Sequence, residues 1–166
     1  LITGTVIGQE KSFFGFNAVL TAMFSGETYA INSQPVSLAI LPSPLSILAK
    51  LNNIPDYVAS LGDTLKYTLT YTNNSDVVMQ NIAVSAKLTS ELFAFQSLSA
   101  DVPFNSLTNT ITWFVGNAPQ LMNLAPTQSG SLEFSIRLKD TFPIRLLSDK
   151  NFTLKLDARV ESPTVP

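Results

Sequence analysis

The sequence predicts an all-β fold in which two antiparallel sheets pack as a sandwich. From Leu65 to Tyr71 every second residue is large and apolar, and the residues between are Lys or Thr, which is the period of a half-buried strand. After the P-S-P stretch at residues 42–44, roughly seven or eight such segments recur, with turn residues between them, at the spacing of a sandwich. Charged residues make up only 13% of the chain, and Ser, Thr and Asn take their place. That composition is typical of strands with a hydroxyl-bearing outer face.

Turn signals separate the predicted strands. S-G-E-T covers residues 25–28, P-S-P covers 42–44, and N-N-S-D covers 73–76. Pro35 indicates a bulge or an edge position within its strand. The segment 92–99 is the least regular and also accommodates a turn of helix. The predicted strands are residues 1–8, 11–24, 28–41, 45–51, 56–61, 64–72, 77–89, 92–99, 110–116, 131–139 and 151–162.

An internal repeat divides the chain after residue 42. The pattern I-T-x-x-V starts at Ile2 and again at Ile111, and each copy continues as strand, loop and strand. Residues 1–42 are therefore predicted to be the C-terminal strands of a preceding, incomplete module, and residues 43–166 a complete one. Three strands are marginal alone because their apolar face needs a second sheet. Either the missing strands were lost or are disordered, or another chain supplies strands, or the three strands dock on the second module.

Composition excludes several function classes. The net charge is −2 and the chain has no run of Lys or Arg, so the electrostatic footprint of a nucleic-acid partner is absent. The chain has no Cys and no His, which removes the usual nucleophile, general base and metal ligand. No apolar run reaches the ~18 residues of a membrane-spanning helix. The start at Leu1 rather than Met predicts a piece of a longer protein.

Two stretches resemble a known family. L-G-D-T-L-K-Y-T-L-T-Y-T-N-N-S-D and the later N-T-I-T-W strand are similar to the conserved-repeat immunoglobulin-like domains of large bacterial and archaeal cell-surface proteins. The resemblance covers roughly residues 55–140 and implies an immunoglobulin-like β-sandwich in tandem modules, which acts outside the cell as a stalk, spacer or coat. It implies no catalysis and no cofactor. The matching residues are Gly62, Asp63, Tyr67, Thr72, Asn73, Trp113, Pro126 and Gly130.

The chain departs from that family at Phe114 and in the longer loop before Gly130. Ile111, Trp113 and Val115 share one face of their strand, which predicts a core Trp, and Phe114 then points outward. An outward Phe beside an apolar loop is a candidate contact surface, unless the loop covers it. The candidate interaction residues are Phe114, Leu121, Met122 and Leu124, together with Phe142 and Ile144.

Three kinds of chemistry compete with simpler roles for the polar side chains. Lys66 and Lys155 suggest a Lys–Asn isopeptide cross-link, but the strand alternation turns both outward as solvated lysines. Single Asp residues stand at turns, where they bond nearby backbone groups, although calcium at Asp56 or Asp63 between the modules stays open. Asn73 and Asn151 match the N-glycosylation pattern.

Two functions follow as expectations. The first is a non-catalytic structural module of an extracellular or cell-surface bacterial protein. The alternative is an adhesin or carbohydrate-binding sandwich that uses its loop ends or exposed aromatic residues. An enzyme is not expected, because nothing places an acid and a base together. The expected partners are neighbouring modules of the same chain, and other copies of the chain or host and environmental ligands are further candidates.

Overall fold

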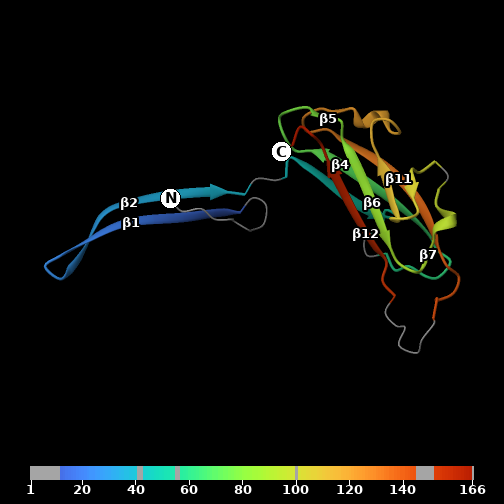
Figure 1. Cartoon of the computed structure of the whole chain (residues 1–166), viewed down its shortest axis with the longest axis horizontal. Helices are drawn as coiled ribbons and strands as arrows, with labels where there is room; N and C mark the ends of the chain where they lie inside the picture. Colours follow the sequence, from blue (N-terminus) through green and yellow to red (C-terminus); the bar gives the residue numbers. More distant parts are fainter. Residues whose placement is uncertain (1–11, 41–42, 55–56, 100, 145–151, 166) are drawn as a thin grey trace. The chain divides into compact units, whose positions relative to one another are not determined.

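The computed structural model describes residues 12–40, 43–54, 57–99, 101–144 and 152–165. The chain divides into two compact units, Leu1–Ser43 and Pro44–Pro166 (Figure 1). The described part contains antiparallel strands and two short 3-10 helices, so the all-β prediction is confirmed. No helix in the described part is long and apolar enough to cross a membrane.

The first unit contains a long β-hairpin. Strand β1 (Phe13–Phe24) pairs antiparallel with β2 (Glu27–Ala39) through a turn whose two residues, Ser25 and Gly26, have φ of 52° and 83°. Positive φ at both positions is what a two-residue hairpin turn requires. Both strands of a two-stranded ribbon are edges, which is where Pro35 is tolerated. The irregularity in the register lies between Leu20 and Thr21 and not at Pro35.

Strands β1 and β2 were predicted to repeat the strands that follow Ile111, but their pairing differs from the pairing of those strands. Strands β11 (Ser129–Leu138) and β12 (Lys155–Glu161) follow the second I-T-x-x-V pattern, yet they lie in different sheets. Strands β1 and β2 instead pair with each other. The predicted strand over residues 1–8 lies outside the described residues.

The second unit contains two four-stranded antiparallel sheets. The first sheet has the order β3-β4-β11-β7 and the second has the order β12-β6-β9-β8 (Figure 1). Short strands β5 and β10 form a separate pair. The remaining bounds are β3 (Leu45–Leu51), β4 (Thr64–Asn73), β5 (Met79–Gln80), β6 (Ala83–Thr89), β7 (Phe93–Ala94), β8 (Phe104–Asn105), β9 (Thr110–Trp113) and β10 (Asn123–Leu124), with 3-10 helices η1 (Phe95–Ser97) and η2 (Pro119–Leu121).

The apolar residues that alternate along these strands form one core between the two sheets. Trp113 is only 6% exposed, as predicted, and its ring lies 6.0 Å from that of Phe134. Phe134 also stacks on Tyr67 at 4.9 Å. Both sheets therefore bury one face against the other, which is the layout of a β-sandwich. The buried residues on the main strands are Leu65, Tyr67, Leu69, Tyr71, Val84, Ala86, Leu88, Ile111, Trp113, Leu132, Phe134, Ile136 and Leu138.

Three predicted strands are wrong or only partly correct. Residues 57–60 form no strand, because the Asp63 carboxylate accepts hydrogen bonds from the Tyr57 hydroxyl and the Ser60 N–H and folds the segment into a turn. The predicted strand 77–89 is split at Asn81, whose φ of 49° no strand accommodates. Segment 92–99 holds a two-residue strand and helix η1, so the turn of helix is confirmed.

Gly130 on β11 lies directly opposite Tyr71 on β4 and is required by the packing there. A Cβ atom at Gly130 would overlap the Tyr71 ring, including its hydroxyl oxygen. Tyr71 is only 1% exposed, so its ring has little free space to move into. The absence of a side chain at position 130 therefore allows the central strand pair of the first sheet to form around a buried tyrosine.

We expect Gly130→Ala to lower the free energy of unfolding of the sandwich by about 1–3 kcal/mol, the usual cost of an overpacked core. Denaturant titration followed by the fluorescence of Trp113, the single Trp of the chain, reports this unit specifically. Gly15→Ala is the matched control, because nothing lies within 4 Å of a Cβ there. Equal midpoints for Gly130→Ala and the unchanged chain would contradict this account.

Candidate functional site

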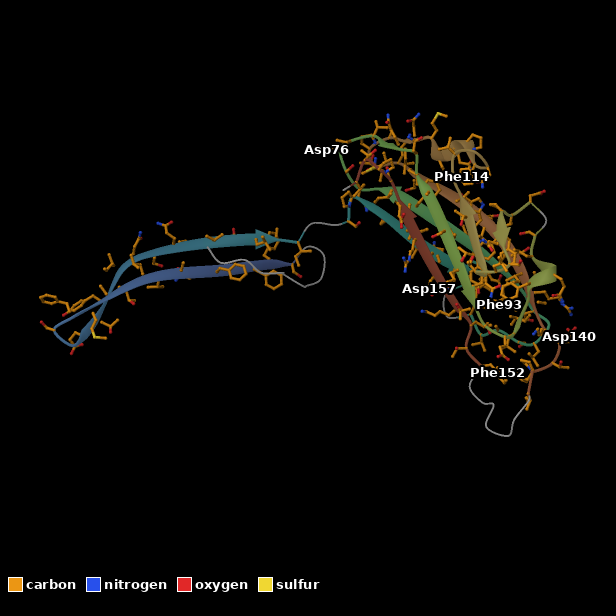
Figure 2. All side chains as sticks on the ribbon, viewed as in Figure 1. Asp76, Phe93, Phe114, Asp140, Phe152 and Asp157 are labelled. Carbon is orange, nitrogen blue, oxygen red and sulfur yellow. The ribbon has the colours of Figure 1, made fainter. Side chains whose placement is uncertain are left out.

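The candidate interaction residues do not form one surface. Phe114 lies at one end of the sandwich, whereas Asp140 and Phe152 lie at the other (Figure 2). Phe142 stacks on Phe152 with ring centroids 5.3 Å apart, so it belongs with the second group. The structure therefore offers two separate small patches, at opposite ends of the two sheets.

Leu121 and Leu124 are not surface residues, which corrects the prediction. Leu121 is fully buried and Leu124 is 5% exposed. Helix η2 ends at Leu121, whose carbonyl accepts the N–H of Ile82 at 2.9 Å, and Leu124 lies on β10, where it pairs with Met79 of β5. Both side chains close this end of the core and so cannot contact a ligand.

Phe114 and Met122 are exposed by 52% and 51%, so the loop does not cover Phe114. The Asn117 side chain fixes this loop: its Oδ1 accepts the Phe114 N–H at 2.9 Å, and its Nδ2 donates to the Thr112 carbonyl at 3.1 Å. The Phe114 ring lies over Gly116, where a Cβ would come within 2.6 Å of the ring. The aromatic ring is therefore held on a defined backbone rather than on a free loop.

Further apolar surface at this end was missed by the sequence analysis. Val77 and Val78 are 51% and 44% exposed, and they directly follow Asp76, which lies at the same end as Phe114 (Figure 2). The alternation rule assigned these valines to the start of a strand, whereas the strand begins only at Met79. With Phe114 and Met122 they make up what we call the Phe114 end.

The second patch is smaller in the described part of the chain. Phe142 is 49% exposed and Ile144 is 63% exposed. The Ile144 N–H donates to the Phe142 carbonyl at 2.9 Å, which curls this segment after β11. The stack of Phe142 on Phe152 shields one face of the Phe142 ring and leaves part of it accessible.

The two lysines considered for a cross-link both lie at the surface. The Lys66 Nζ pairs with Glu133 Oε2 at 2.8 Å, and the Lys155 Nζ pairs with Asp157 Oδ2 at 3.1 Å. Their side chains are 55% and 64% exposed. A Lys–Asn cross-link needs a buried, desolvated amine that loses its proton readily, and neither environment supplies one.

Among the turn aspartates, Asp63 acts as predicted, by bonding the backbone of its own loop, whereas Asp140 pairs with an arginine side chain. Asp63 Oδ2 accepts the Ser60 N–H at 2.7 Å and the Tyr57 hydroxyl at 2.8 Å, and these hydrogen bonds hold the pKa of the carboxyl below its ordinary value. Asp140 pairs with Arg137 at 2.6 Å, and Arg137 Nε also donates to the Gly62 carbonyl. The described residues contain no group of three potential metal ligands. Asp56 and Asp149 lie outside them.

Asn73, which matches the N-glycosylation pattern, has a structural role. It is fully buried, and its Nδ2 donates to the carbonyls of Val77 and Leu124 at 2.7 and 3.0 Å. Its Oδ1 accepts the N–H and the hydroxyl of Ser75. A glycan could not reach this nitrogen in the folded chain. The other match, Asn151, lies outside the described residues.

A hollow of about 440 Å³ lies where β12 ends, lined by Asn81, Ala83, Glu161, Ser162, Pro163 and Val165. Glu161 is the one carboxylate among these residues. Hydrolysis of a glycosidic bond usually needs two carboxyl groups across the bond. The arrangement of this hollow does not supply that pair.

Comparison with known proteins adds distant likenesses. No family model matches the chain, and no curated protein matches it. An exo-β-N-acetylglucosaminidase of family GH20 from Vibrio harveyi has a TM-score of 0.40 at 16% identity, over 72% of this chain and 17% of that one. Chitinase ChiA74 from Bacillus thuringiensis has a TM-score of 0.37 at 10% identity, over 91% and 27%. The chain therefore spans about a quarter or less of either protein, and at these scores neither likeness bears on its function.

The lowered pKa of Asp63 makes the stability of the fold depend on pH in the acidic range. Because its pKa is lower in the folded chain than in the unfolded one, the unfolded chain takes up a proton first as the pH falls. We expect the melting temperature to drop as the pH falls below about 4, and the drop to be shallower in Asp63→Asn. Glu133, whose pKa Lys66 also lowers, leaves a residual slope. Parallel curves of melting temperature against pH for the two chains would refute the assignment.

Proposed function

We propose that this chain is a non-catalytic structural module of a bacterial cell-surface or secreted protein, an immunoglobulin-like sandwich that acts as a stalk, spacer or coat. The observation that carries the proposal is that polar side chains of the second unit form hydrogen bonds and ion pairs within the domain. The side chains that could suggest chemistry, Asp63, Lys66, Asn73, Arg137 and Asp140, each bond within the domain. They hold turns and strand ends in place.

The outer face of the sandwich supports the same proposal. Thr68, Thr70 and Thr72 occupy the outward side of β4, and the Thr72 hydroxyl bonds Ser129 on the neighbouring strand at 2.8 Å. β-Branched residues stiffen a strand, and hydroxyl groups keep its outer face hydrated with little charge. The P-S-P sequence between the two units favours extended backbone at the residues before its prolines. A stiff sandwich suits a spacer.

Surface labelling tests the proposed location. Intact cells of the source organism should bind an antibody raised against residues 44–166, and a protease that does not enter cells should remove the signal. A cytosolic protein detected in the same samples is the control, and it should resist the protease until the cells are lysed. Detection of the module only after lysis would overturn the proposal.

Adhesion is the second candidate, and the exposed ring of Phe114 favours it. The Phe114 end presents an aromatic ring on a loop fixed by Asn117, with Met122 further along the same connection and Val77 and Val78 on the segment before β5. Exposed apolar patches often mark contacts. Sugar rings stack on accessible aromatic faces, so a carbohydrate is the ligand class to test first.

A glycan array probed with the whole chain tests this candidate. If the Phe114 end binds a sugar, we expect Phe114→Ser to lose at least about tenfold in affinity, because the stacking face is removed. Phe142→Ser is the matched control at the opposite end and should bind as the unchanged chain does. Flat signal across the array, or equal losses in both variants, would reject sugar binding at Phe114.

A further inference from the structure

Strand β12 is an edge strand: β6 is its one hydrogen-bonded neighbour among the described strands, and β3 of the other sheet lies close to it without pairing. Strand β12 pairs through its inner side with β6, from Lys155 opposite Thr89 to Glu161 opposite Ala83 (Figure 1). An unpaired edge presents a row of backbone N–H and C=O groups that can accept another strand. The seven residues of β12 contain no Pro and no Gly that would interrupt such pairing.

The core side of β12 is less buried than that of its neighbour. Leu156, Ala158 and Val160 pack against the core but remain partly exposed. Their partners on β6, namely Leu88, Ala86 and Val84, are fully buried. The edge therefore leaves apolar surface that a further strand would cover.

The residues of β12 that alternate with its core-facing side chains are charged, and their charges alternate in sign: Lys155, Asp157, Arg159 and Glu161. Arg159 and Glu161 have no ion-pair partner in the described part of the chain, whereas Lys155 reaches Asp157 at 3.1 Å. In the order K-L-D-A-R-V-E, residues at equal distance from Ala158 carry opposite charge: Lys155 mirrors Glu161, and Asp157 mirrors Arg159.

We propose that β12 pairs antiparallel with β12 of a second copy of this chain, across a two-fold axis at Ala158. In that register Lys155 lies opposite Glu161 of the second copy and Asp157 opposite its Arg159, and each pair occurs twice. Leu156 lies opposite Val160 on the core side. The β12-β6-β9-β8 sheets of the two copies join into one continuous sheet. The same residues form the interface on both copies, as two-fold symmetry requires.

Charge complementarity selects this occupant over other arrangements. Parallel in-register pairing of two β12 strands would place like charges side by side, which is unfavourable. The opposite margins of the sandwich are β7 and β8, which have two residues each and are too short to pair. The other long edge, β3, reads L-S-I-L-A-K-L and has no such charge symmetry. The proposal goes beyond the spacer role and does not depend on it.

Charge reversal tests the pairing with the full 166-residue chain. By sedimentation over a concentration series, we expect the unchanged chain to approach twice the monomer mass of 18.0 kDa. Asp157→Lys and Arg159→Glu should each remain at the monomer mass, because each places like charges opposite one another twice. An equal mixture of the two variants should regain the dimer, because both cross-strand pairs then attract. Asp76→Lys makes the same charge change at an exposed turn and should not alter the mass.

Trp113 fluorescence and circular dichroism establish whether each variant is folded. If Asp157→Lys or Arg159→Glu does not fold, the same experiment is done with Lys155→Glu and Glu161→Lys, alone and mixed. Recovery of the dimer in the mixture, together with weaker dimers at high salt, supports the proposal. A chain that stays monomeric at every concentration overturns it. So does a dimer that survives both single reversals, or a mixture that stays monomeric.

Discussion

The buried amide of Asn73 joins the end of β4 and the turn that follows it to β10, which lies 51 residues further along the chain. It ends β4, holds the turn to Val77 that leads into β5, and reaches the carbonyl of Leu124 on β10. Buried polar groups are costly unless they are bonded, and both the oxygen and the nitrogen of this side chain have partners. The short β5–β10 pair, and the loop that carries Val77 and Val78, therefore depend on Asn73 for their position.

The distribution of chemistry follows from the two-sheet layout. The turns lie at the ends of a sandwich. Here the Asp63 carboxylate and the Asn117 amide form hydrogen bonds with the backbone of their own turns. In the described part of the second unit, the surfaces noted above are apolar or lie along an edge: the Phe114 end, the Phe142 patch and the outer edge of β12. Exposed apolar side chains also line β1 and β2 of the first unit.

Local alternation predicted the main strands well, because each inner face must be apolar. It placed Leu65, Tyr67, Leu69 and Tyr71 inside and Phe114 outside, as the structure has them. It failed where contacts outside the strand itself decide the conformation. Nothing in the spacing of residues 117–125 shows that Leu121 and Leu124 turn inward onto the core, and nothing near residue 57 shows that Asp63 captures Tyr57. Nor could it identify β12 as an edge, because that depends on which strands pair across the whole domain.

The turn at Ser25 and Gly26 also has a consequence for the order of folding. It joins β1 and β2 through two residues, so the hairpin closes with almost no loop entropy, and such hairpins form in about 1–10 μs. The central pair of the sandwich, β4 with β11, must bring together residues such as Thr72 and Ser129, which lie 57 positions apart. Contacts of that separation form slowly. During synthesis from the N-terminus, the hairpin is therefore complete before the sandwich has all its strands, and its apolar side chains meet the cellular environment first.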